Sequence, residues 1–316
     1  MTLLPIQPVD APLYVVTPIV NPCRYRSRYH LYHDFAKHIT DAGAILYTVE
    51  AAYGDRAFEV TGPANPRHIR VRTHHELWHK ENLINIAVSR LPPDWKYMAW
   101  IDADVQFARA DIVEETIHQL QHYSVVQMFS HAMDLGPLHE PLRTFDGFMA
   151  QWLHQGGAMP PPASGYGVWH PGYAWACRRE AWDHLGGLID HAIVGSADSY
   201  MAYGLISDVA RVLPAEMISA CPTYTEWCLA WAARAEAHIR RNVGFVDGLL
   251  LHYFHGAKRN RGYAERSEIL WRNGFDPLRD IKRDWQGLWQ LNDQKLRLRD
   301  DLRSYFRNRD EDSTAV

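Results

Sequence analysis

Short β-rich apolar runs alternate with amphipathic helical segments through the first half of this 316-residue chain. The strand-like runs cover residues 13–19, 44–49, 68–72, 97–101 and 125–129, and apolar side chains recur at helical spacing over residues 29–39, 75–89 and 108–122. Strands that alternate with helices usually build parallel βαβ units. The sequence therefore predicts an α/β fold in which helices flank a mostly parallel, Rossmann-like sheet.

The pattern changes twice along the chain. Residues 136–167 are rich in Gly and Pro and are too long for an ordinary connection, so we expect a mobile insertion there. From residue 263 onward, apolar side chains recur at helical spacing. We therefore expect one α/β domain over residues 1–262 and a C-terminal helical extension over residues 263–316.

Composition excludes several classes of protein. No apolar run approaches the roughly 18 residues that a membrane span needs, and no secretory signal is visible. The four cysteines have no metal-knuckle spacing, which suits a reducing compartment, so we expect a cytoplasmic protein. The net charge is −4, yet residues 258–309 hold 14 basic and eight acidic residues. That segment can meet a polyanion or can form a solvated face of mixed charge.

Two carboxylates, Asp102 and Asp104, directly follow the apolar run 97–101. Side chains two apart on a strand point the same way, so we expect both at one end of the sheet. Like charges repel, and a divalent cation is their natural partner. Mn²⁺ or Mg²⁺ takes its remaining ligands from phosphates and water, so the pair predicts a metal–diphosphate site. The same D-x-D pattern also occurs in turns and helix caps.

Basic residues on two early segments are candidates for binding the diphosphate. Arg24 and Arg26 follow the first strand-like run, at the end of the sheet where open α/β folds bind ligands, although both can equally be surface arginines. Lys80, in the second helical segment, can reach a phosphate. Asn85 can bind the nucleotide or brace a loop, and Glu81 and Asn85 can equally be an exposed i,i+4 pair.

A glycine- and aromatic-rich block further along is a candidate for binding the sugar or its acceptor. Gly172 allows close backbone approach, and His170 precedes it. Tyr173 or Trp175 can stack on a sugar ring, although an aromatic side chain in such a place more often belongs to the core. Asp198, among small residues, is the candidate general base for an acceptor hydroxyl, although Asp after Gly-Ser is also a common helix cap.

A late block combines imidazoles with cations. A neutral imidazole can complete a metal shell opposite the two aspartates, and His255, followed by Gly and basic residues, is the better candidate, with His252 as the spare. Lys258, Arg259 or Arg261 can neutralise a leaving diphosphate.

The order of these blocks resembles metal-dependent glycosyltransferases of the GT-A fold, most of all the galactosyltransferase and N-acetylgalactosaminyltransferase type. The resemblance covers residues 12–262 and rests on P-x-R-x-R, a Lys-x-x-x-x-Asn helix, D-x-D, Gly-Gly, an acid and a late His-Gly. It implies that Arg24, Arg26 and Lys80 contact a nucleoside diphosphate. It also implies that Asp102, Asp104 and His255 bind manganese. The family often carries paired acids in a Trp- and Gly-rich stretch where this chain has only Asp198.

These observations predict a glycosyltransferase of the hexosyltransferase type that uses a nucleotide sugar, a UDP-sugar first, and a divalent cation. We expect residues 136–167 to close over the acceptor. A hydroxymethylated pyrimidine in DNA is the first acceptor considered, as in a phage or bacterial DNA-modifying enzyme, with a cell-surface glycan or lipid-linked compound as the alternative. A nucleotidyltransferase and a non-catalytic carbohydrate-binding protein remain open as other classes.

Overall fold

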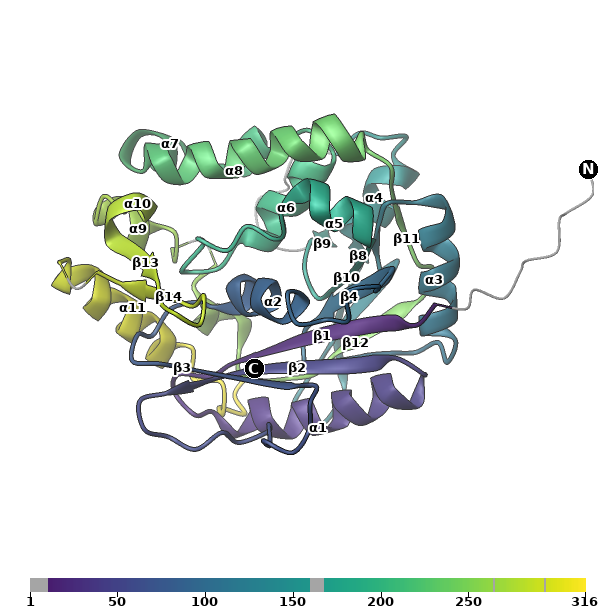
Figure 1. Ribbon diagram of the computed structural model, residues 1–316, viewed down its shortest axis with the longest axis horizontal. Coiled ribbons are helices and arrows are strands. Elements are labelled where there is room, and N and C mark those ends of the chain that lie inside the picture. Colours follow the sequence, from purple (N-terminus) through teal and green to yellow (C-terminus); the bar gives the residue numbers. More distant parts are fainter. Residues whose placement is uncertain (1–10, 160–167, 264, 293) are drawn as a thin grey trace, which may run out of the picture.

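The computed structural model describes residues 11–159, 168–263, 265–292 and 294–316. A seven-stranded sheet runs through its centre, with helices on both faces (Figure 1). In spatial order its strands are β11 (Val243–Phe245), β6 (Val125–Gln127), β10 (Ala174–Arg178), β4 (Tyr97–Ile101), β1 (Leu13–Val20), β2 (Ile45–Tyr53) and β3 (His68–Thr73). The α/β architecture predicted from the alternating pattern is confirmed.

Most neighbouring strands of this sheet are parallel. β1 pairs in parallel with β2 and β4, β2 with β3, and β11 with β6. β10 lies antiparallel between β4 and β6. The carboxyl ends of β1 and β4 therefore lie side by side at the same end of the strands, which is where open α/β folds bind ligands.

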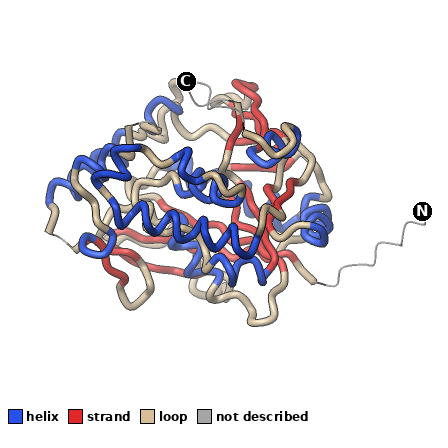
Figure 2. Tube along the Cα trace, turned by 90° about the horizontal axis from the view of Figure 1, so that it is seen from above, coloured by secondary structure: helices blue, strands red, loops and turns tan. Residues whose placement is uncertain are grey.

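Side-chain alternation along the strands divides the core into two layers. Along β4, Met98 and Trp100 face one layer, while Ala99 and Ile101 face the other. Helices α1 (Arg26–Asp41) and α3 (Ile112–His122) contribute to the second layer, and α2 (Lys80–Val88), α5 (Arg179–Leu185), α6 (Ala197–Leu205) and α8 (Pro222–Arg234) to the first. Seen from above, helices lie over the strands (Figure 2).

A second sheet of five strands stands beside the first. Its spatial order is β5 (Val105–Phe107), β12 (Leu249–His252), β7 (His131–Leu135), β8 (Pro141–Gly147) and β9 (Trp169–His170). β5 follows β4 after a short turn, and β12 pairs with both β5 and β7. This sheet places residues from three distant parts of the chain next to the end of β4.

The segment predicted as a mobile insertion contains regular structure. β8 and α4 (Phe148–His154) occupy much of it, and Phe148 and Met149 are fully buried. Gly and Pro therefore mark the ends of elements here rather than one long loop. Residues 160–167 lie outside the described part of the chain.

The segment predicted as wholly helical is only partly so. It contains α9 (Glu268–Arg272), α10 (Pro277–Asp280) and α11 (Leu296–Asn308), but β13 (Ile281–Arg283) and β14 (Trp289–Leu291) form a hairpin between them. Gly287, with φ +83°, helps to turn the chain there. The expectation of a helix at Trp289 is wrong, because the spacing of apolar residues along the hairpin imitates helical periodicity.

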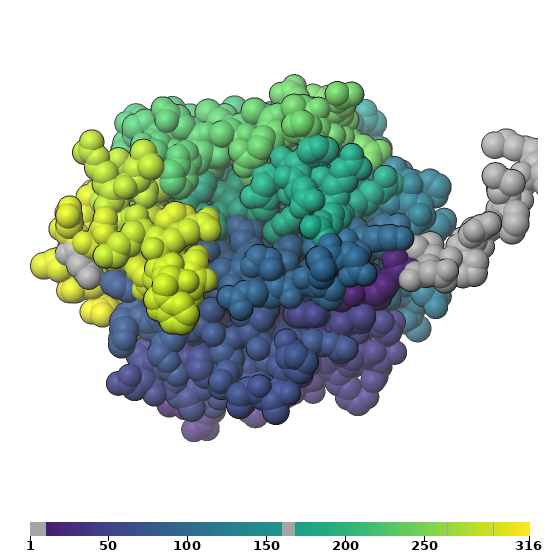
Figure 3. Space-filling model, viewed as in Figure 1, coloured from purple at the N-terminus to yellow at the C-terminus, as the bar shows by residue number. Residues whose placement is uncertain are grey.

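The last residues pack back on the first part of the chain. In Figure 3 the C-terminal segment lies directly against residues from the N-terminal half.

The short helix α7 (Ala215–Ala220) precedes α8 on the side of the fold away from α1 (Figure 1). No helix among the described residues has the length and apolar character to cross a membrane.

Candidate active site

A pocket opens at the carboxyl ends of β1 and β4. It encloses about 970 Å³ of space, including solvent at its mouth. Strand ends, the start of α2, the start of α6 and the segment after β12 form its wall. Its ionisable side chains include Arg28, Lys80, Glu81, Asp102, Asp104, Asp198, His252, His255, Arg261, Arg266 and Arg309.

The two aspartates of the D-x-D pattern both line this pocket, but they do not share a strand. β4 ends just before them, and Asp102–Asp104 form the turn into β5. The two carboxylates therefore share the pocket as expected but have different partners, because they stand in a turn rather than on the strand. Asp102 Oδ1 lies 2.5 Å from Lys80 Nζ. Asp104 Oδ2 lies 3.1 Å from Arg28 Nη1 and 2.9 Å from His255 Nε2.

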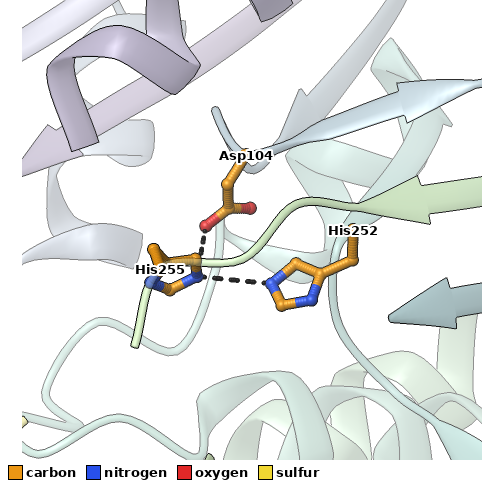
Figure 4. A group of neighbouring side chains, drawn as sticks. All are labelled: Asp104, His252 and His255. Atoms are coloured by element: carbon orange, nitrogen blue, oxygen red, sulfur yellow. Dashed lines mark hydrogen bonds and ion pairs between the residues drawn. The ribbon is translucent and has the colours of Figure 1, made fainter. Parts of the chain in front are cut away.

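Asp104 forms a compact cluster with two imidazoles (Figure 4). One ligand atom from each of Asp104, His252 and His255 lies within 4.8 Å of the others, and all three residues are buried. The two Nε2 atoms of His252 and His255 are 3.3 Å apart. The structure thus brings Asp104 and His255 together, as the sequence predicts, and the second choice, His252, joins them. Their binding of a metal stays a prediction.

Hydrogen bonds at the back of the cluster direct the lone pairs inward. Asp134 Oδ1 lies 2.9 Å from His252 Nδ1, so that nitrogen donates and Nε2 keeps its lone pair toward His255. A carboxylate behind a histidine is the usual support for a metal-binding imidazole. Asp104 Oδ1 is buried and has no hydrogen-bond partner among the described residues. The Asp104 oxygen and the His252 lone pair fit a divalent cation such as Mn²⁺. His255 Nε2 would have to release the hydrogen bond that it accepts from Arg261 Nη2 at 3.0 Å before it joined them.

Burial keeps the cluster in the protonation states that a cation requires. Burial lowers the pKa of His252 to about 4, against the raising effect of Asp134. Burial and the neighbouring Arg261 also lower the pKa of His255. Burial alone would raise the pKa of Asp104, but His255 holds it well below its usual value. Two neutral imidazoles and one carboxylate can bind a cation without first losing a proton.

Arg261 brings a buried positive charge into the same pocket. Its side chain is 5% exposed, and it donates to His255 Nε2 at 3.0 Å and to the Tyr263 hydroxyl at 3.1 Å. Within the described part of the chain it forms no ion pair with a carboxylate, and its Nε has no hydrogen-bond partner there. Arg266 and Arg309 also line the pocket. A buried guanidinium in this state favours an anionic ligand, since burial without a counter-charge is costly.

Two arginines predicted to bind the donor do not line this pocket. Arg24 is exposed and pairs with Glu59 at 2.6 Å. Arg26 is exposed at the start of α1. Both follow β1 as expected, but their side chains lie outside the pocket wall. Their contacts with a nucleotide stay predictions.

Asn85 and Lys258, also predicted to bind the donor, have partners within the chain instead. Asn85 bonds both backbone groups of Leu188, at 3.0 Å and 2.8 Å, so it braces a loop, which is the alternative that the sequence left open. Lys258 pairs with Asp134 and stands over the Phe145 ring at 4.8 Å. Neither side chain lines the pocket, and their roles toward a donor stay predictions.

The glycine- and aromatic-rich block lies at the wall of the pocket. His170 and Tyr173 line it and stack on each other with ring centroids 3.7 Å apart. Trp175 is 4% exposed and donates to the Pro171 carbonyl at 2.8 Å, which is a core role. The block therefore places two buried, mutually stacked rings in the pocket wall, while its tryptophan supports the sheet, and a contact with a sugar or acceptor stays a prediction.

Asp198 lies in the first turn of α6 and lines the pocket. Its Oδ1 accepts a hydrogen bond from the Ser199 backbone at 2.9 Å, and Ser196 takes the N-cap position. A side chain at Gly172 would place its Cβ 2.7 Å from Asp198 Oδ2, so glycine gives that carboxylate its room. Asp198 is therefore not the N-cap residue itself, although it lies in the first turn of the helix, and its carboxylate also faces the pocket. Its role as the general base stays a prediction.

Glu81 is part of the pocket wall, and the alternative that it is exposed helix surface is wrong. The side chain is 4% exposed and lines the pocket beside Lys80 and Asp198. Burial raises the pKa of Glu81 to about 8, and Asp198 and Asp102 add to the rise while Lys80 opposes it. The signal available in the sequence is its position next to Lys80, at the start of a helix that reaches the D-x-D turn.

This pKa predicts a pH-dependent stability effect for Glu81→Gln. Because the folded protein holds the proton more tightly than the unfolded chain, the protein loses stability as the pH rises from about 4.5 to about 8. Glutamine cannot ionise, so the variant should be more stable than the wild type at about pH 9 by a few kcal/mol, and nearly equal at about pH 5. Urea unfolding at both pH values measures this. A stability difference that is the same at both would contradict it.

No protein-family model matches the chain, and no curated protein matches it. Among solved structures, it is similar to a Drosophila beta-1,4-galactosyltransferase 7 variant in complex with manganese, UDP-Gal and xylobiose, at 11% identity and a TM-score of 0.35. That match covers 60% of this chain and 59% of the galactosyltransferase chain, so the chain spans about three fifths of it.

Two further structures are similar over more of the chain. One is a glycosyltransferase involved in glycosylation of the major capsid of PBCV-1, at 11% identity and a TM-score of 0.36, covering 81% of this chain and 97% of that one. The other is glucosyl-3-phosphoglycerate synthase from Mycobacterium tuberculosis, at 11% identity and a TM-score of 0.37, covering 84% and 76%. The functional argument therefore depends on the chain's own residues.

Proposed function

We propose that the chain is a glycosyltransferase that takes a sugar from a nucleotide-sugar donor, a UDP-sugar first, with a divalent cation. One observation carries the proposal: two buried atoms of opposite character without hydrogen-bond partners in the described chain, Asp104 Oδ1 and Arg261 Nε, belong to residues that line one pocket. The first suits a cation and the second suits an anion. A metal-bound diphosphate satisfies both.

The cation would be held by Asp104, His252 and His255, with Asp102 as a further predicted ligand. Asp102 pairs with Lys80, so it can turn to a cation only if that lysine turns to a phosphate. When bound, a dication supplies charge neutralisation for the leaving diphosphate.

Basic side chains would hold the diphosphate beside the cation. Arg261 and Lys80 line the pocket and can donate to phosphate oxygens there. Arg24 and Arg26 keep their predicted contacts to the nucleotide as part of this proposal. Lys258 stays a predicted donor contact that would first have to leave Asp134.

Asp198 would serve the acceptor. The acceptor hydroxyl oxygen forms a bond to the anomeric carbon, the bond from that carbon to the diphosphate oxygen breaks, and Asp198 accepts the hydroxyl proton. Gly172 leaves space for that carboxylate at the wall of the pocket. Tyr173 and His170 present a stacked aromatic surface in the same wall.

The charges of the C-terminal segment bear on the choice of acceptor. Several of its cations are paired within the chain, among them Arg307 with Glu76 at 2.7 Å and Lys295 with Asp280 at 2.7 Å. Pairing lowers the positive charge that the segment offers to a polyanion. This favours a glycan or lipid-linked hydroxyl over hydroxymethylated DNA, which stays the other proposed acceptor.

Donor hydrolysis and transfer test the proposal. Purified protein with Mn²⁺ and a panel of labelled UDP-sugars should release UDP from at least one donor, faster when a suitable acceptor is present. Salt-sensitive transfer to hydroxymethylated DNA would favour the DNA acceptor, and transfer to glycans in moderate salt the other. If no nucleotide sugar is bound or consumed, the proposal is wrong.

A further inference from the structure

The C-terminal residues Arg309–Asp312 follow α11 and lie against the candidate cation site. Arg309 and Glu311 are each 4% exposed, although they stand within eight residues of the last residue. Arg309 lines the pocket itself. These four residues form the tail segment, and its contacts reach the opposite end of the sequence.

Glu311 is at the centre of these contacts. Its carboxylate accepts two hydrogen bonds from Arg28, of 2.5 Å from Nε and 2.9 Å from Nη2, and a third from Arg309 Nε at 2.6 Å. Its Oε2 is also 3.8 Å from His255 Nδ1. Asp104, Arg28, Glu311 and Arg309 thus form a largely buried chain of alternating charges.

The backbone is shaped to receive this segment. Gly256, next to His255, has φ +83°, and a Cβ there would lie 2.7 Å from the Asp310 carbonyl oxygen and 2.8 Å from Glu311 Cα. Asp312 accepts hydrogen bonds of 2.9 Å from the backbone amides at the first two positions of α1. The anion-binding end of α1 is therefore filled by a carboxylate of the chain itself.

Arg28 is shared between two carboxylates, and this sets up a competition. Its Nη1 lies 3.1 Å from Asp104 Oδ2, the same oxygen that faces His255. If Glu311 did not hold the guanidinium, Arg28 would be free to pair fully with Asp104. A cation would then have to displace a positive charge from its own ligand.

We propose that Glu311 is a positioning residue of the cation site: it holds Arg28 so that Asp104 remains available to a divalent cation. Of the four tail residues, Glu311 is then the one that acts on the site, and it does so through Arg28. This inference rests on the proposed function, in that it assumes the Asp104 cluster binds a dication.

Mn²⁺ binding to the full chain, followed by electron paramagnetic resonance without any nucleotide, tests the inference. Glu311→Gln should weaken Mn²⁺ binding by about 10- to 100-fold, the usual loss when an outer partner of a metal ligand is removed. The matched control is Asp310→Asn, which removes the same charge from an exposed neighbour whose φ of +42° asparagine tolerates. The control should bind Mn²⁺ like the wild type.

A double variant separates positioning from a general structural effect. If Glu311 acts by restraining Arg28, then Arg28→Gln combined with Glu311→Gln should recover Mn²⁺ affinity to within about threefold of the wild type, as non-additive coupled sites do. Failure of this rescue, or wild-type or tighter Mn²⁺ binding by Glu311→Gln alone, would overturn the inference while leaving the proposed function standing. Absence of Mn²⁺ binding by the wild-type protein, both without and with UDP, would overturn both.

Discussion

Asp104→Asn should abolish measurable Mn²⁺ binding and donor turnover together. Asp104 offers the only carboxylate of the described cluster with His252 and His255, and its Oδ1 has no other partner there. An amide is a weaker ligand and brings no negative charge to a cation. The loss should exceed the roughly 10- to 100-fold that removal of an outer partner costs.

The control for this variant is Asp300→Asn. Asp300 has a side chain that is 62% exposed and pairs with its neighbour Arg299 on α11. Removing this surface charge should leave Mn²⁺ affinity and turnover within about twofold, because exposed ion pairs contribute little. Retention of Mn²⁺ binding by Asp104→Asn would show that the cluster in Figure 4 is not the cation site.

Arg261→Met should weaken UDP binding by about 10- to 100-fold without lowering the unfolding temperature. Hydrogen bonds to a charged group contribute roughly 1.5–3 kcal/mol, which corresponds to that loss of affinity. The folded protein meanwhile no longer buries a guanidinium that lacks a carboxylate partner among the described residues. Removing a buried charge that forms no ion pair also removes its desolvation cost, so the unfolding temperature should not fall.

Calorimetric UDP titration in Mn²⁺ and a thermal unfolding scan measure the two effects of this substitution. Arg261→Lys is the matched variant, since it keeps the charge but loses the planar fork, and it should fall between the wild type and Arg261→Met in UDP affinity. Unchanged UDP affinity in Arg261→Met would exclude Arg261 from the diphosphate site. A large fall in unfolding temperature would instead assign it a structural role.

The closeness of Asp104 and His255 could be predicted because Asp104 belongs to the D-x-D pattern and His255 to the late His-Gly pattern. These two patterns follow each other along the chain in a known order. The sequence favours His255 over His252, since no local pattern shows that Asp134, 118 positions before His252, supports the ring of that histidine. Parallel strands were predictable from the alternation of elements. The antiparallel placement of β10 was not, because it depends on pairing with β4 and β6 rather than on its own residues.

The roles that the sequence could not predict belong to residues that are buried by contacts with distant parts of the chain. Glu81 is a charged residue of the kind found on exposed helix surfaces. It becomes part of the pocket wall only because α2 packs against β1 and β2. Glu311 acts on Arg28 across 283 positions, and no local pattern connects them. The hairpin of β13 and β14 imitates helical spacing with its apolar residues, so periodicity alone predicts the wrong element.

The central claim is that one pocket binds a dication and a nucleoside diphosphate as a unit. The most direct test is to titrate UDP into the protein in a calorimeter, once in buffer with Mn²⁺ and once in buffer with EDTA. If the claim is right, Mn²⁺ tightens UDP binding by a factor within or above the roughly 5- to 150-fold typical of coupled ligands, and UDP tightens Mn²⁺ binding equally. The same UDP affinity in Mn²⁺ and in EDTA, or no UDP binding in either, would contradict it.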